Sequence, residues 1–114
     1  MFAGGVVFRG LYKVEFETPR GKARGVVNAQ DGQLRGGSSA FAYVGSYSQQ
    51  GSTIIGDVAS RRHSNDVNLP SVYPFDEVRI SFSGVVSGDL AMCEGTAAEA
   101  PGLKFKALLT KLAD

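Results

Sequence analysis

Short runs of alternating residues, separated by glycine-containing turns, are the feature that most constrains how this chain can fold. In residues 11–17, Tyr12, Val14 and Phe16 fall on one face and Lys13 and two glutamates on the other. A period of two predicts a strand with one buried face. Asp31-Gly32 ends the next run, and this dipeptide is one of the strongest short signals of a β-hairpin. The pattern therefore predicts antiparallel strands joined by tight turns.

The same pattern divides the whole chain into eight expected strands. An open sheet leaves its two outer strands unpaired, whereas closure into a barrel removes both edges. We therefore expect an all-β, eight-stranded antiparallel up-and-down barrel, with a two-sheet sandwich as the alternative. The last segment is ambiguous, because Ala107-Leu108-Leu109 suits a helix equally well. The expected strands are residues 11–17, 22–30, 33–39, 41–48, 52–60, 76–86, 90–97 and 103–112, with a long loop over 61–75 and a turn over 99–102.

Length and composition fit one domain spanning residues 1–114, with residues 1–9 as a flexible or partner-contacting arm. The chain can bury one modest core, and 43% hydrophobic and 20% charged residues are ordinary for a folded soluble protein. The net charge is only +1 and the basic residues are dispersed, which argues against nucleic-acid binding. Arg61-Arg62-His63 is expected to be a solvated loop cluster.

Several features indicate a cytoplasmic protein without a membrane partner. Cys93 is the only cysteine, so no intrachain disulfide can form, which fits a reducing compartment. The first residues lack the basic region of a secretion signal. No apolar run approaches the ~18 residues of a membrane helix.

The chain offers no group of residues that predicts catalysis. A single histidine, His63, excludes most triads and histidine-rich metal sites. Gly4-Gly5 and Gly36-Gly37 lack the spacing of phosphate-binding loops. We therefore expect neither an enzyme nor a cofactor. Glu94 could become a buried acid facing the interior if Leu90 and Met92 also face inward, and a bulge near Gly95 would turn it outward.

Inward-facing aromatic residues either fill the interior of such a barrel or line a cavity for a small apolar ligand. The candidate lining residues are Tyr12, Phe16, Phe41, Tyr43, Tyr47, Phe82, Glu94 and Phe105. On the outer face, the fourth and fifth strands are expected to place aliphatic side chains side by side, which predicts a two-fold homodimer. The candidate interface residues are Ala42, Val44, Thr53 and Ile55.

The order of several glycine-containing segments resembles the GrlR family, small negative regulators of type III secretion in bacteria. The segments are Gly10-Leu-Tyr-Lys-Val-Glu-Phe, Gly25-Val-Val-Asn-Ala-Gln-Asp-Gly, Gly36-Gly37, Tyr43-Val-Gly-Ser-Tyr, Gly51-Ser-Thr-Ile-Ile-Gly-Asp-Val and Asn68-Leu-Pro-Ser-Val. The match covers roughly residues 10–86.

This resemblance implies a calycin-like barrel, usually dimeric, that controls a transcriptional activator by protein contact and not by binding DNA. Where those regulators carry an acidic run, this chain has Ser48-Gln49-Gln50-Gly51. The sequence thus predicts a non-enzymatic bacterial regulatory protein that acts through protein contact. The alternative is a carrier or sensor that binds a small molecule or lipid inside the barrel.

Overall fold

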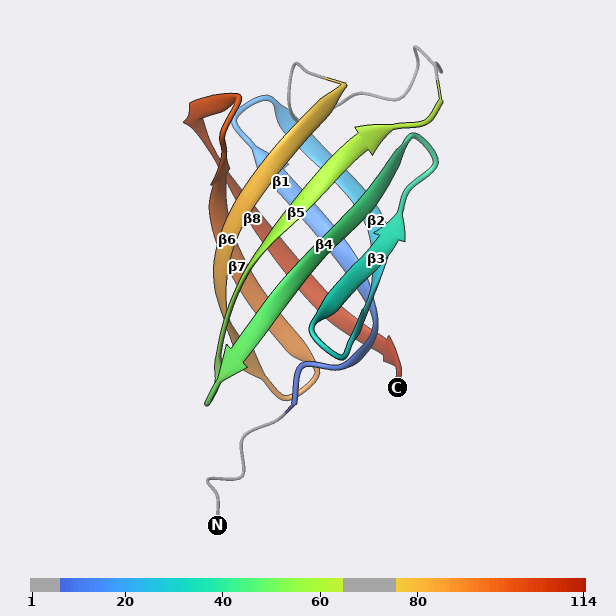
Figure 1. Ribbon diagram of the computed structural model, residues 1–114, viewed down its shortest axis with the longest axis vertical. Coiled ribbons are helices and arrows are strands. Elements are labelled where there is room, and N and C mark those ends of the chain that lie inside the picture. The colour runs from blue at the N-terminus through green and yellow to red at the C-terminus, as the bar shows by residue number, and fades with distance from the viewer. Residues whose placement is uncertain (1–6, 65–75) are drawn as a thin grey trace.

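The computed structural model describes residues 7–64 and 76–114, which form an all-β barrel (Figure 1). The eight strands are arranged around the barrel in chain order, and the described residues contain no helix. They are β1 (Gly10–Thr18), β2 (Gly21–Gln30), β3 (Gln33–Gly37), β4 (Phe41–Gln50), β5 (Thr53–Arg62), β6 (Glu77–Ser87), β7 (Leu90–Ala97) and β8 (Ala100–Ala113). Within the two described stretches, no helix is long and apolar enough to cross a membrane.

The sheet is closed, because β8 pairs with both β7 and β1. Each strand is antiparallel to its neighbours in the chain, and Leu11 at the start of β1 lies opposite Ala113 at the end of β8. This confirms the up-and-down barrel and excludes the two-sheet sandwich. It also settles the last segment as a strand, because pairing on both sides requires an extended backbone there.

One of the turns predicted from the sequence lies where it was expected, and another does not. Asp31 (φ 52°) and Gly32 (φ 79°) both adopt the left-handed conformation of a tight hairpin turn, as predicted. The turn expected over residues 99–102 is instead Ala98–Glu99, and Pro101 lies within β8. The pairing of β7 with β8 shifts register next to it, between Thr96 and Ala97. Proline lacks an N–H group, so it is tolerated at such an irregularity.

The long loop is shorter at its start than expected, because β5 continues through Arg61 and Arg62. Arg61 lies opposite Glu77, and the two form an ion pair of 3.7 Å. Arg62 contacts Asp76 at 3.0 Å, and its guanidinium lies 4.7 Å from the centre of the Phe41 ring. The expectation of a loop is therefore wrong for both arginines, which belong to β5. Arg61 is solvated as expected, with 67% of its side chain exposed, whereas Arg62 is only 19% exposed. Residues 65–75 of the expected loop lie outside the described residues.

Large and small residues alternate around the barrel interior. Five direct cross-strand neighbours on β4 to β8 are Tyr47, Gly56, Phe82, Gly95 and Phe105. A Cβ atom added at Gly95 would lie 2.7 Å from Cε1 of Phe105, and one at Gly56 would lie 2.8 Å from Cζ of Phe82. Each glycine therefore makes room for the aromatic ring of a neighbouring strand, which is how a narrow barrel accommodates large side chains.

Candidate functional site

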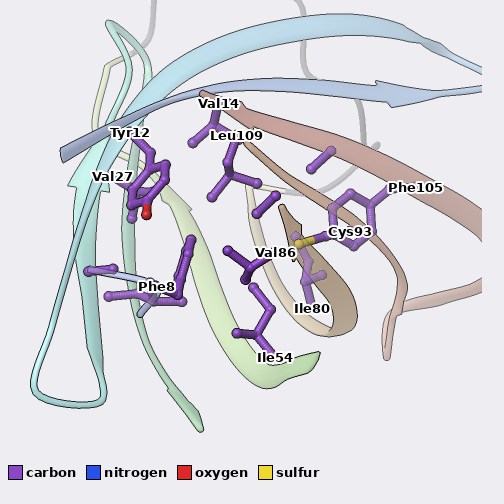
Figure 2. Packing of buried hydrophobic residues seen from close by; sticks show 14 of the residues in the cluster. Phe8, Tyr12, Val14, Val27, Ile54, Ile80, Val86, Cys93, Phe105 and Leu109 are labelled. Atoms are coloured by element: carbon purple, nitrogen blue, oxygen red, sulfur yellow. The ribbon is translucent and has the colours of Figure 1, made fainter. Parts of the chain in front are cut away.

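A cavity of about 200 Å³ occupies the interior of the barrel. Its wall is mainly aliphatic and aromatic, and most of these side chains are buried (Figure 2). Apolar cavities of this order stay dry and bind small apolar molecules. The apolar lining residues include Val14, Val27, Leu34, Ile54, Val78, Ile80, Phe105 and Leu109.

One end of the barrel is closed by Phe8, which is 1% exposed and lies just before β1. Its ring packs on Tyr12 at 4.7 Å and edge-on against Tyr47 at 5.2 Å between ring centres. The Phe8 N–H donates to Oε1 of Gln49 at 2.7 Å, and the Tyr47 hydroxyl donates to the Phe8 carbonyl at 3.0 Å. Ring burial and two satisfied backbone groups thus hold Phe8 in place. Residues 1–6 of the expected arm lie outside the described residues, but Phe8 belongs to the core.

Among the described residues, the opposite end is less enclosed, because β3 is short. β3 has five residues and pairs with β2 only from Val26 onward, so residues 21–25 of β2 pair with β1 alone. The cavity extends here to Lys22, Ala23 and Arg24 of β2 and to residues 38–40 in the turn between β3 and β4. We call this part of the cavity, lined by residues 22–24 and 38–40, the opening.

The turn beside the opening is organised by Ser38. Its hydroxyl oxygen accepts hydrogen bonds from the N–H groups of Ala40 at 3.3 Å and Phe41 at 3.1 Å. The ring nitrogen Nε2 of His63 lies 3.0 Å from the Ser38 carbonyl, and the His63 N–H donates to the Ala40 carbonyl at 2.8 Å. These hydrogen bonds connect the turn between β3 and β4 to His63, which follows β5, and fix one side of the opening.

Tyr43 brings a hydroxyl group to the same region. Burial raises the pKa of Tyr43, and a hydrogen bond with the Ser38 side chain partly lowers it again. Its ring packs edge-on against Phe16, with 5.4 Å between ring centres. A Cβ atom at Gly25 would lie 2.9 Å from Cε2 of Tyr43, so the ring needs a glycine beside it on β2. A neutral Tyr43 can donate one hydrogen bond toward this end of the cavity.

Cys93 lies on the cavity wall further inside and is 7% exposed. Burial raises the pKa of its thiol from 9.0 to about 12. The thiolate is the reactive form of cysteine, so this side chain acts as a small apolar lining residue. That agrees with the packing role expected from the sequence.

The structure places most of the predicted lining residues on the cavity, but not all. Phe16, Phe41, Tyr43, Phe82 and Phe105 line it. Tyr12 and Tyr47 instead contact Phe8 at the closed end. Sequence reasoning missed Phe8, because a single aromatic residue ahead of the first alternating run gives no periodic signal.

Glu94 does not face the interior, which corrects its assignment as a lining residue. On β7 the small residues Ala91 and Cys93 are buried, whereas Leu90 and Met92 are exposed with Glu94. Gly95 stays in register opposite Phe82, so no bulge is responsible. Glu94 faces outward because the interior beside β7 is narrow. A Cβ at Gly84 would lie 2.5 Å from the Cys93 sulfur, so the interior next to β7 accepts only small side chains.

Of the four predicted dimer residues, Val44, Thr53 and Ile55 are exposed and Ala42 is half-buried, and they do not form one patch. Val44 is 51% and Ile55 54% exposed. Val44 lies opposite Ala59, whereas Ile55 lies opposite Ser48, four residues further along β4. The expectation that the two aliphatic side chains lie side by side is therefore wrong, because the long β4–β5 hairpin offsets them.

Among the described residues, apolar side chains do adjoin on the outer face of β6, β7 and β8. Val85 lies opposite Met92, and Met92 lies opposite Leu108. Val85 is 55% and Met92 68% exposed, and Leu90 on the same face of β7 is 43% exposed. We call Val85, Met92 and Leu108, together with Leu90, the outer apolar row.

Comparison with known proteins assigns the chain to no family. No protein-family model matches it, and no curated protein matches it. Among residues 7–64 and 76–114, no group of three or more His, Cys, Asp or Glu side chains is arranged to hold a metal ion.

Proposed function

We propose that this protein binds a small apolar molecule inside its barrel, as a carrier or sensor. The cavity of about 200 Å³ with its apolar wall is the observation that supports this function. Ligand sites are typically concave and mostly apolar, with a few polar groups that orient the ligand. The cavity has this composition, because its hydroxyl groups, on Ser38, Ser39, Tyr43 and Ser60, are few compared with its apolar residues.

A titration with 1-decanol followed by native mass spectrometry tests this proposal. We expect one alcohol molecule per chain. Val58 lines the cavity and lies opposite Gly45, so Val58→Phe places a ring in the cavity and should weaken binding at least tenfold. Ala59→Phe is the matched control, because alternation places Ala59 on the outer face, opposite Val44. The proposal fails if the wild type retains no alcohol, or if Val58→Phe binds it as tightly as Ala59→Phe does.

The regulatory role implied by the resemblance is a second candidate, and the outer apolar row favours it. Exposed apolar side chains that adjoin on neighbouring strands, such as Val85 of β6 and Met92 of β7, are typical of a protein contact. We propose that a second copy of the chain occupies this row, because a two-fold contact uses each exposed side chain twice.

Light scattering on three proteins tests the dimer. We expect a wild-type dimer that Val85→Lys with Met92→Lys converts to a monomer, while Val44→Lys leaves it intact. Loss of the dimer in Val44→Lys alone would place the interface on the face first predicted for Ala42, Val44, Thr53 and Ile55. A monomeric wild type would contradict the proposed dimer.

A further inference from the structure

The charged residues at the cavity are of one sign. Among the described residues that line it, only Lys22 and Arg24 are charged. They flank Ala23 on β2, where the strand has no β3 partner. Lys22 is 3.9 Å from Glu17, but both side chains are largely exposed, and such pairs contribute little. Arg24 forms no ion pair with any residue in the described stretches. Lys22 and Arg24 lie opposite Glu17 and Glu15 of β1, and no ion pair among the described residues buries either cation.

The hydroxyl groups that line the cavity lie on the same side of it. Ser38 and Ser39 belong to the opening, and Tyr43 hydrogen-bonds with Ser38. Ser60 lies opposite Tyr43 in the neighbouring strand. At the other end, Phe8 and Ile54 present only apolar surface. The cavity thus changes from apolar at the closed end to polar and then cationic at the opening.

From this arrangement we infer that the ligand is amphipathic and carries an acidic head group, a carboxylate, which Lys22 and Arg24 hold at the opening while its apolar part fills the barrel. The inference rests on the proposed function and adds the chemical class of the ligand. Charge-assisted hydrogen bonds from lysine and arginine to a carboxylate are stronger than those between neutral groups. An apolar tail alone would use neither cation.

The test compares decanoic acid with 1-decanol, which have the same chain length and differ in the head group. We expect the acid to bind the wild type at least fivefold more tightly at pH 7.5 and low salt, where its carboxyl group is ionised. Salt should reduce this preference, because charges at an exposed opening are screened. Lys22→Gln with Arg24→Gln should bring the affinity for the acid to within twofold of the affinity for the alcohol. Arg20→Gln with Arg35→Gln removes the same charge from two residues that do not line the cavity, and should preserve the preference.

The outcomes separate this inference from the proposed function. If the alcohol and the acid bind equally well, or if the control variant loses the preference as fully as the Lys22 and Arg24 variant, the acidic head group is wrong and the apolar site stands. If neither compound binds, or if Val58→Phe displaces neither, the proposed function fails and the inference fails with it.

Discussion

The two ends of the barrel differ in their side chains, which are aromatic at the closed end and polar or cationic at the opening. At the closed end, Phe8 is nearly inaccessible and is held by two aromatic rings and two hydrogen bonds to its backbone. At the opening, serines, Lys22 and Arg24 adjoin a stretch of β2 that has a strand partner on one side only. We therefore expect stability to be concentrated at the closed end, and the proposed ligand recognition at the opening. Three measurements test this difference between the two ends.

The largest expected difference is in thiol reactivity. Cys93 should react with a disulfide reagent at pH 8 far more slowly than a cysteine placed at the opening by Ser39→Cys in a Cys93→Ala background. A pKa of about 12 in place of 9.0 lowers the thiolate fraction roughly a thousandfold, and burial slows access further. Absorbance of the released thiolate measures both rates. Equal rates would show that the interior is as accessible as the opening.

Truncating Phe8 should have the next largest effect. Phe8→Ala removes a buried ring and should lower the free energy of unfolding by about 3–5 kcal/mol. Phe41→Ala, on the cavity wall near the opening, should cost less, about 1–3 kcal/mol, because part of that ring already faces empty space. Urea denaturation compares the two variants. A greater loss in Phe41→Ala than in Phe8→Ala would reverse this difference between the two ends.

The smallest effect concerns two tyrosine hydroxyls. Tyr47→Phe removes the donor to the Phe8 carbonyl and should cost about 0.5–1.5 kcal/mol in urea denaturation. Tyr43→Phe at the opening should cost less, because Ser38 still accepts hydrogen bonds from two backbone N–H groups. If Tyr43→Phe were the more destabilising of the two, the hydroxyls at the opening would have a structural role as well.

Much of the fold followed from local sequence patterns. The eight strands and the Asp31-Gly32 turn were predictable because alternation and turn chemistry act over a few residues. The predictions were wrong where packing between distant strands decides which side chains face the interior. Leu90 and Met92 are larger and more apolar than Ala91 and Cys93, yet they face outward because the interior beside Gly84 has no room for them.

The site was predictable in part, for the same reason. Phe16, Phe82 and Phe105 were placed on the cavity by the period of their strands. Along β2, Lys22 and Arg24 alternate with Ala23 and Gly25, and nothing local shows that a short β3 leaves the cavity open beside them. The length of a neighbouring strand is a property of the assembled sheet, so a single alternating run cannot reveal it.

The closure of β1 on β8 has a consequence for the order of folding. Seven of the eight strand pairings join consecutive strands, but Leu11 and Ala113 meet from opposite ends of the chain. The hairpins can form from short segments, whereas closure must bring the two ends together at a greater cost in chain entropy. During synthesis the barrel cannot close until β8 has left the ribosome. We therefore expect closure to be the last and slowest step of folding, and the cavity to exist only once it is complete.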